Sequence, residues 1–253
     1  MKVHVAESRI ELGHTAARDI ATALRARLRE QERVRMILAA APSQSEMLAA
    51  LIQEPEIDWT RVTAFHMDEY IGLPEDAPQR CAHWLRQALA DHVPLARFEP
   101  INPGVFPQET CNKYAKLLAK EPVDLVLLGI GTNGHLAFND PSANLEDPDA
   151  VKIVTLDRMC REQQVLDGCF AAFDDVPLEA ITLTVPTLLA GHELFCCVPG
   201  QLKSVAVQSM FELPVSGECP ATALRTHPCC NLYLDRDSNS KSRHHVHFDN
   251  HRP

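Results

Sequence analysis

One loop in this chain carries the residue types that proton-transfer chemistry needs. Gly129–Pro141 contains three glycines, two asparagines, one aspartate and one histidine, and it follows a nearly unbroken apolar run that begins at Val123. His135 can exchange protons near neutral pH, and Asn133 and Asp140 are spaced so that each could orient one imidazole nitrogen. The glycines let the backbone approach a ligand closely. The pattern predicts a catalytic histidine, and the alternative is a histidine that only satisfies loop carbonyls.

Two adjacent carboxylates, Asp68 and Glu69, form a second candidate. They follow the expected strand Arg61–Phe65 and precede a loop that contains Gly72 and Pro74. Neighbouring side chains in an extended chain point to opposite sides, so at most one of the two is expected to face a shared crevice. A carboxylate there can act as a base when its surroundings bring its pKa close to the working pH. The alternative is a solvated pair at the end of a strand.

Two further segments favour anion binding. Ser43 is expected to cap the helix that follows the strand Val34–Ala40, which would leave the first helical N–H groups available to a phosphate. Lys203 is expected in the first helical turn after the strand Leu194–Val198, where a cation opposes the helix dipole. A lysine in that unfavourable place indicates a nearby anion. Simple helix capping by Ser43 and a surface-exposed Lys203 are the competing interpretations.

Alternating apolar runs and helical patterns are the elements that must position these residues. The expected strands are Val34–Ala40, Arg61–Phe65, Val123–Ile130, Ala180–Thr184, Leu194–Val198 and Leu232–Asp235. The expected helices are Thr15–Arg29, Gln44–Ile52, Gln79–Leu89, Pro107–Leu118 and Leu202–Phe211. Strands that alternate with helices imply parallel crossovers, and ligands bind at the carboxyl ends of such strands. We therefore predict an α/β fold with a single doubly wound, mainly parallel, Rossmann-like sheet and helices on both faces.

The composition fits one ordinary globular domain. The chain has 253 residues, a net charge of −10 and 45% hydrophobic residues. We find no basic cluster, so nucleic acid is not an expected partner. No apolar run of about 18 residues and no signal-peptide pattern is present, so we expect no membrane association and a cytoplasmic location.

The cysteines fit neither a zinc site nor a disulfide framework. There are nine, an odd number, and no two of them form a C-x-x-C pair. Cys196 and Cys197 are adjacent, as are Cys229 and Cys230, so each pair should place its side chains on opposite faces of a strand. We predict free cysteines that serve as small core hydrophobes.

The end of the chain differs from the rest in composition. We assign residues 1–235 to the α/β domain and residues 236–253 to a polar tail that is expected to be disordered. The tail histidines are His244, His245, His247 and His251. No core pattern holds them in place, so we predict no metal site there or elsewhere in the chain.

Together these segments resemble the glucosamine-6-phosphate deaminase (isomerase) family, which forms a larger group with the 6-phosphogluconolactonases. Phe65–Leu73 is similar to the pattern F-x-M-D-E-Y-x-G-L. Gly129–Pro141 is similar to G-x-G-x-N-G-H-x-A-F-N-[DE]-P, and Gly200–Lys203 fits G-x-x-K. The resemblance extends more thinly from about Val3 to Asp235.

The resemblance implies a reaction and the residues that carry it. Asp68 would be the base that moves a proton between C1 and C2 during aldose–ketose isomerisation, and His135, supported by Asp140 and Asn133, would help to open the pyranose ring. Loss of ammonia from C2 would then convert glucosamine 6-phosphate, or a close relative, to fructose 6-phosphate, with no metal or organic cofactor. The implied substrate- and phosphate-binding residues are Ser43, Gln44, Glu69, Gly131, Gly134 and Lys203.

The chain departs from the family pattern in its phosphate loop. The usual T-G-G-[ST] is replaced by Ala40-Ala41-Pro42-Ser43, which removes glycine flexibility and one N–H group. An arginine of the family is absent near Gln164, and Arg158 and Arg161 are the nearest substitutes. The sequence therefore leaves the exact sugar phosphate open.

Two other functions stay open. A 6-phosphogluconolactonase-type hydrolase shares the fold, but it would cleave an ester and release no ammonia; the Asp68-Glu69-Tyr70 and Ala137-Phe138-Asn139 contexts favour the deaminase. A non-catalytic sugar-phosphate sensor is opposed by the presence of Asp68 and His135 and by the lack of a helix-turn-helix in this sequence. The relatives include monomers and hexamers, so a homo-oligomer also stays open.

Overall fold

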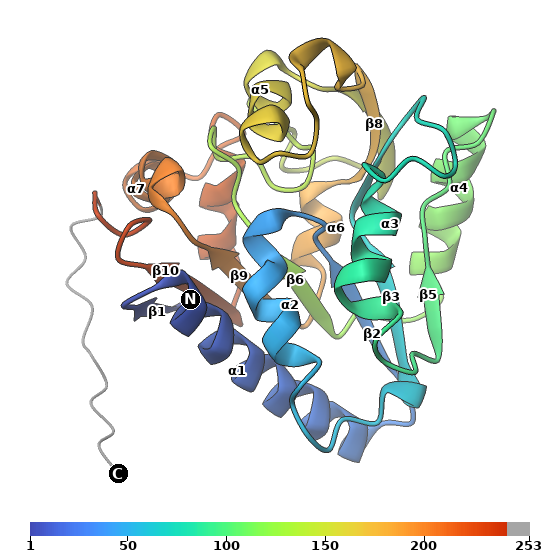
Figure 1. Cartoon of the computed structure of the whole chain (residues 1–253), viewed down its shortest axis with the longest axis vertical. Helices are drawn as coiled ribbons and strands as arrows, with labels where there is room; N and C mark the ends of the chain where they lie inside the picture. Colours follow the sequence, from blue (N-terminus) through green and yellow to red (C-terminus); the bar gives the residue numbers. More distant parts are fainter. Residues whose placement is uncertain (242–253) are drawn as a thin grey trace.

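The computed structural model describes residues 1–241 and contains two sheets (Figure 1). The strands of the seven-stranded parallel sheet are, in spatial order, β1 (Lys2–Ala6), β10 (Cys230–Asp235), β9 (Glu193–Val198), β6 (Leu125–Leu128), β2 (Val34–Leu38), β3 (Val62–His66) and β5 (Arg97–Glu99). The three-stranded antiparallel sheet has the order β4 (Asp68–Tyr70), β8 (Glu179–Leu183) and β7 (Val151–Thr155). The predicted doubly wound, mainly parallel α/β fold is confirmed.

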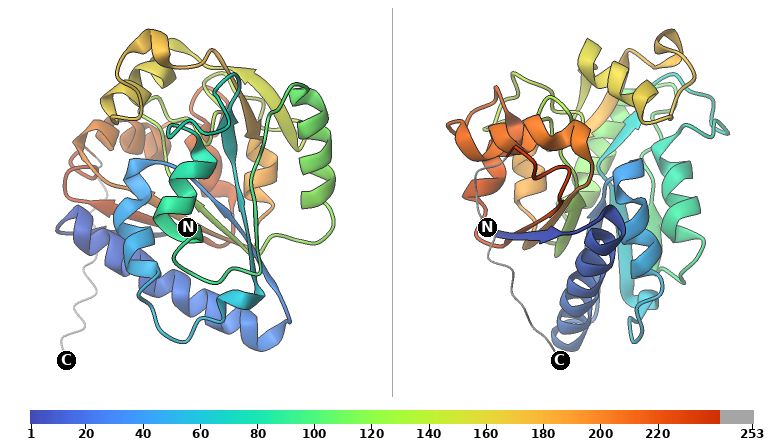
Figure 2. Two further views of the ribbon diagram at one scale, coloured as in Figure 1. Left: turned by 45° about the vertical axis from the view of Figure 1, so that its right-hand side comes forward. Right: turned by 60° about the vertical axis from the view of Figure 1, so that its left-hand side comes forward.

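Helices cover both faces of the large sheet (Figure 2). The α-helices are α1 (Arg9–Glu30), α2 (Ser45–Leu51), α3 (Cys81–Leu85), α4 (Pro107–Leu118), α5 (Arg158–Leu166), α6 (Val185–Leu189) and α7 (Ser204–Glu212). The short helices are the 3-10 segments η1 (Pro42–Gln44), η2 (Trp59–Arg61), η4 (Phe173–Asp175), η5 (Gln201–Lys203) and η6 (Pro220–Thr226), and the π-helical turn η3 (Arg86–Ala90). One core lies between the sheet and α1, α2 and η3, and the other lies between the sheet and α4, α6 and α7.

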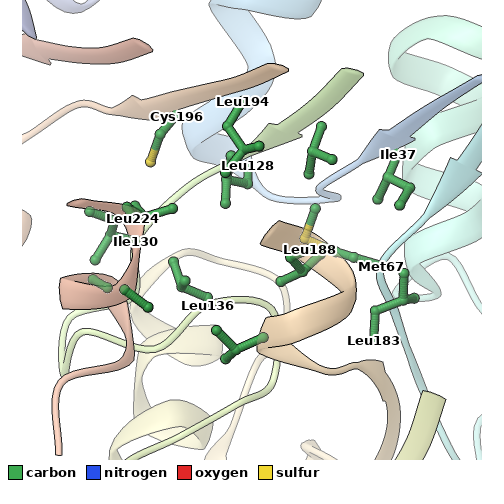
Figure 3. Close-up of a cluster of buried hydrophobic side chains, with 14 of the residues drawn as sticks. Ile37, Met67, Leu128, Ile130, Leu136, Leu183, Leu188, Leu194, Cys196 and Leu224 are labelled. Carbon is green, nitrogen blue, oxygen red and sulfur yellow. The ribbon is translucent and has the colours of Figure 1, made fainter. Parts of the chain in front are cut away.

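Alternation along the buried strands divides the side chains between these two cores. In β9, Leu194 and Cys196 belong to the core under α6 and α7, which Figure 3 shows, whereas Phe195 and Cys197 belong to the core under α1. This confirms that Cys196 and Cys197 face opposite ways. All nine cysteines are free and seven of them are buried, as small core hydrophobes would be.

Several elements differ from the sequence-based expectations. The expected strand Ala180–Thr184 exists as β8, but it pairs antiparallel with β4 and β7 and lies outside the large sheet. Strands β1, β4, β5 and β7 and helices α5 and α6 were not predicted. β4 and β5 contain three residues each, too few to show a period-2 pattern. Helix α1 begins at Arg9 instead of Thr15, because Ser8 accepts a hydrogen bond from the Glu11 N–H and caps it there.

The strand order creates a crevice at the centre of the sheet. From β2 the chain passes through β3 to β5 on one side, whereas β6, β9 and β10 lie on the other side of β2. β2 and β6 pair in parallel, with Met36 opposite Leu125 and Leu38 opposite Leu127. A reversal of strand order of this kind separates the loops at the carboxyl ends of the two strands and leaves a crevice between them. Ser43 and Gln44 follow β2 and the Gly129–Pro141 loop follows β6, whereas Asp68 and Glu69 follow β3 and Lys203 follows β9.

The described chain continues a few residues beyond β10. Ser238 is buried and exchanges hydrogen bonds with Asp235, and the residues up to 241 form a turn. Residues 242–253, with the four tail histidines, lie outside the described residues. Among residues 1–241 no helix is long and apolar enough to cross a membrane.

Candidate active site

The carboxyl ends of four adjacent strands open into one cavity. β3, β2, β6 and β9 are neighbours in the sheet, and each is followed by residues that line this cavity. Helix α5, which lies above the strand ends in Figure 1, contributes further lining residues. Of the ten residues that the sequence analysis assigned to the site, the cavity is lined by Ser43, Gln44, Asp68, Gly131, His135 and Lys203.

Asp68 is a buried cavity residue whose surroundings bring its pKa close to neutral pH. It begins β4, which leaves the end of β3 and pairs with β8 so that Asp68 lies opposite Thr182. Its side chain is buried, and this burial raises the pKa of the carboxyl to about 7. The neighbouring charge of Glu69 adds to the rise, while a hydrogen bond with Cys81 opposes it. A carboxylate with a pKa near the working pH can both take and return a proton.

Glu69 faces away from the cavity, so its predicted contact with substrate is corrected. Its carboxylate accepts hydrogen bonds from the N–H groups of Tyr70, Cys81 and Ala82 at 3.0, 3.0 and 3.1 Å. Its Oε2 also lies 3.5 Å from Nε of Arg80. Since Cys81 and Ala82 open α3, Glu69 stabilises the start of that helix. Alternation along β4 explains why only one carboxylate of the pair faces the cavity.

His135 is held against the backbone of its own loop. A Cβ atom on Gly131 would overlap the imidazole ring, so only glycine leaves room for His135 at this point. The Gly131 N–H also donates to the carbonyl of His135 at 2.9 Å. Nδ1 of His135 lies 3.2 Å from Oδ1 of Asp140, and the histidine is 7% exposed. This places an imidazole beside a carboxylate at the cavity wall, an arrangement that can support proton transfer.

Asn133 acts on Asp140 and not on the imidazole, which corrects its predicted role. Its Nδ2 donates to Oδ1 of Asp140 at 3.0 Å and to Oδ2 of Asp157 at 3.2 Å, and its Oδ1 accepts from the His135 N–H at 3.0 Å. Burial alone would raise the pKa of Asp140, but hydrogen bonds from His135 and Asn133 outweigh it and hold that pKa below its usual value. Asp140 therefore stays ionised and orients His135, while neither Asp140 nor Asn133 lines the cavity.

Gly134, a predicted binding residue, lies outside the cavity lining and has a role in the shape of the loop. Its φ is +87°, a conformation that favours glycine, and its carbonyl accepts from the Ala221 N–H at 2.8 Å. A Cβ there would lie 2.7 Å from Sγ of Cys219. Gly134 thus packs the loop against η6.

Ser43 and Gln44 line the cavity, but Ser43 is not a helix cap. The N-cap positions of η1 and α2 are occupied by Ala41 and Gln44, and neither makes a side-chain capping bond. Gln44 is fully buried, and its Nε2 donates to Oγ of Ser43 and to the carbonyl of Cys197, both at 3.1 Å. Pro42 occupies the first position of η1 and offers no N–H.

Lys203 is buried in the cavity wall, which excludes the surface-exposed interpretation. It ends η5, directly after the turn at Gly200, whose φ is +94°, and it is 7% exposed. Burial lowers the pKa of its ammonium group, and attraction to Asp167 opposes this effect.

The two arginines proposed as substitutes for the family arginine point elsewhere. Arg161 donates to the carbonyls of Phe173 and Val176, and exposed Arg158 pairs with Glu162.

Four cavity residues with polar side chains were absent from the predicted set: Tyr70, Gln163, Gln164 and Asp167. The Tyr70 hydroxyl donates to Oε1 of Gln164 at 2.7 Å. Gln163 accepts from the Thr132 N–H at 2.8 Å and donates to Oδ2 of Asp167 at 3.1 Å. Gln163 and Gln164 lie in α5, and Asp167 is its C-cap residue. The sequence signal that could have predicted this helix is Asp157, an N-capping residue that precedes a run of strong helix formers.

One group of side chains has the spacing of a metal site. Ligand atoms of His135, Asp140 and Cys160 lie within 4.8 Å of one another. Burial raises the pKa of the Cys160 thiol far above its usual value, so the thiol stays protonated and is a poor ligand. Both oxygens of Asp140 already accept hydrogen bonds, from Asn133 and from the Asp157 N–H. The donor set fits a hydrogen-bonded cluster better than a cation.

The sequence of this chain is similar to those of a known enzyme family and of two of its members. Residues 7–231 match the family model described as glucosamine-6-phosphate isomerases/6-phosphogluconolactonase. A glucosamine-6-phosphate deaminase of Bacillus cereus (strain B4264) is 32% identical over 190 residues, which are 75% of this chain and 71% of the relative. One from Bacillus thuringiensis (strain Al Hakam) is 31% identical over the same lengths.

Solved structures share the fold. A monomeric glucosamine-6-phosphate deaminase has a TM-score of 0.88 and 27% identity, with 95% of this chain and 100% of that chain covered. A 6-phosphogluconolactonase from Trypanosoma brucei has a TM-score of 0.79 and 18% identity, with 95% and 98% covered. The family model covers residues 7–231, which is nearly all of the described chain. Both kinds of enzyme named in the family description have this fold. The chain therefore belongs to the glucosamine-6-phosphate isomerase/6-phosphogluconolactonase family.

Proposed function

We propose that this protein is an amino-sugar isomerase and deaminase, which converts glucosamine 6-phosphate or a close relative to the corresponding 2-ketose and ammonia. The observation that carries the proposal is that Asp68 and His135 line the same cavity while differing in environment. Asp68 is a buried carboxyl with a pKa of about 7, and His135 lies beside the ionised Asp140. Two acid–base groups in one cavity, each with its own neighbours, allow two different proton transfers.

Ring opening is assigned to His135. The protonated imidazole gives a proton to the ring oxygen while the C1 hydroxyl proton passes to solvent, the bond between C1 and the ring oxygen breaks, and C1 becomes an aldehyde. Asp140, 3.2 Å from Nδ1 of His135, stabilises the protonated imidazole. The other ring nitrogen is thereby left to exchange protons with the substrate.

Isomerisation is assigned to Asp68. Its carboxylate removes the proton from C2, which carries the amine, while the C1 carbonyl oxygen takes a proton from solvent, and the enolamine that forms takes the abstracted proton back at C1. C1 is thereby reduced to an alcohol and C2 is oxidised to an iminium group, so the electrons stay within the substrate. Water adds at C2, ammonia leaves, and a ketose remains. A base with a pKa near 7 suits this transfer because the same group must accept and then return the proton.

The test is ammonia release from glucosamine 6-phosphate and from glucosamine, with the ketose product assayed in parallel. We expect ammonia and ketose in equal amounts, and loss of both with Asp68→Asn. Asp174→Asn is the matched control, since Asp174 is exposed and lies outside the cavity lining. Hydrolysis of a 6-phosphogluconolactone with no ammonia released from either amino sugar would refute the proposal in favour of a lactonase.

A further inference from the structure

Tyr70 and Gln164 lie in the wall of the catalytic cavity, and the proposed reaction gives neither of them a role. The Tyr70 hydroxyl donates to Oε1 of Gln164 at 2.7 Å. The Tyr70 ring packs against Phe138 and Phe170, with ring centroids 5.3 and 5.2 Å apart, and the tyrosine is 4% exposed. Its hydroxyl group is therefore held in place before a ligand arrives.

The hydrogen bond between these two side chains leaves an acceptor and a donor next to each other. The Tyr70 oxygen gives its only proton to Gln164 and keeps lone pairs that can accept. Because Oε1 of Gln164 is the acceptor, its Nε2 carries two N–H groups, of which one is directed to the sulfur of Cys160 and the other is available to a ligand. A hydroxyl group both donates and accepts, so the pair is suited to one sugar hydroxyl in one orientation.

The pair also lies where a bound sugar has to extend. The catalytic cavity has a volume of about 70 Å³, well below the roughly 300–1,000 Å³ of most small-molecule sites. A neighbouring crevice of about 290 Å³ shares four lining residues with it, which are Ala40, Tyr70, Gln164 and Asp167. The two spaces together reach the usual range, so a ligand that fills both passes beside Tyr70 and Gln164.

The position of Tyr70 along β4 indicates which part of the sugar the pair meets. Asp68 and Tyr70 are two residues apart in this strand, so both side chains point to the cavity side, with Cα atoms about 6.5–7 Å apart. Asp68 acts at C2 in the proposed reaction, and Lys203 is the one lysine or arginine among the described residues of the lining, which suits it to the phosphate. We infer that Tyr70 and Gln164 bind one ring hydroxyl of the substrate, at C3 or C4, and so decide which amino-sugar phosphate is accepted. The inference rests on the proposed isomerase and deaminase reaction and specifies its substrate.

The experiment compares glucosamine 6-phosphate with its 3-deoxy and 4-deoxy analogues by ammonia release. We expect the wild type to lose at least about tenfold in kcat/KM on one of the two analogues, because removing that hydroxyl leaves a donor and an acceptor unpaired. In Tyr70→Phe and in Gln164→Met the parent sugar should lose this advantage, mainly through a higher KM, while that analogue is turned over about as well as by the wild type. Tyr233→Phe is the matched control and should leave the ratio unchanged, since the buried Tyr233 hydroxyl donates to Oδ2 of Asp19 at 2.8 Å outside the cavity lining.

Equal losses on the parent sugar and both analogues in the two variants would show a purely structural role and overturn the inference. A wild type that does not distinguish the three sugars would overturn it as well. The double variant Tyr70→Phe/Gln164→Met should lose no more than either single variant, since both residues act on one hydroxyl, and a further tenfold loss would contradict this. If no ammonia is released from any of these sugars, the proposed reaction fails. Calorimetric binding then decides the inference, which holds only if one analogue binds at least about tenfold more weakly than the parent sugar to the wild type and not to the variants.

Discussion

Asp68→Asn is expected to abolish turnover and at the same time to stabilise the protein, increasingly so as the pH rises. The carboxyl is 7% exposed, and burial raises its pKa from 3.8 to about 7. The unfolded chain ionises this group near pH 3.8, so between that pH and about 7 the unfolded state holds fewer protons than the folded state. Stability is therefore lost as the pH rises through this range.

The magnitude follows from the two pKa values. The linkage relation gives a penalty on the order of 1.5 kcal/mol at pH 5 and roughly 4 kcal/mol at pH 8. An asparagine carries no charge at either pH, so the substitution removes the pH-dependent penalty that Asp68 imposes on the free energy of unfolding. The stabilisation by Asp68→Asn should therefore be larger at pH 8 than at pH 5 by about 2–3 kcal/mol. Such a gain with loss of activity is the trade-off expected of a buried catalytic charge.

Urea unfolding, followed by the fluorescence of Trp59 and Trp84, measures this difference. Wild type, Asp68→Asn and the exposed control Asp174→Asn are compared at pH 5 and pH 8. The free energy of unfolding of the control should equal that of the wild type at both pH values. A stability gain that is the same at the two pH values, or larger at pH 5, would refute the assignment of a raised pKa to Asp68.

Three further substitutions test the surroundings of the site. Gly131→Ala places a methyl group on the imidazole ring of His135, and we expect kcat/KM to fall by about 100-fold or more, with circular dichroism checking that the fold persists. His135→Gln should lower the rate on the closed-ring sugar more than on an open-chain analogue; equal losses on both would remove its ring-opening role. Glu69→Ala leaves Arg80 and the first N–H groups of α3 without any acceptor and opens a buried cavity, and we expect the free energy of unfolding to fall by about 3–5 kcal/mol in urea titrations. A loss below about 1 kcal/mol would contradict the structural role of Glu69.

The sequence by itself determined the fold class and picked out the two acid–base residues that line the cavity. The apolar run from Val123 to Leu128 and the polar loop after it already specify a buried strand followed by a ligand loop, because hydrophobic periodicity and glycine content are local properties. Helix α4 was predicted with the bounds Pro107–Leu118, since proline at its start and an amphipathic pattern mark it locally. Asp68 and His135 were assigned from motifs that lie within single segments.

Only the tertiary structure decided which neighbours each of these residues has. Asp68 and Glu69 are adjacent in sequence, yet the pairing of β4 with β8 gives the cavity to one and the start of α3 to the other. Gln44 and Cys197 are 153 positions apart, so their hydrogen bond depends on strand order alone. The pKa of Asp68, the burial of Lys203 and its interaction with Asp167 likewise arise from packing between distant segments. Local patterns encode which elements form, whereas burial and charge pairing depend on contacts that exist only after those elements have assembled.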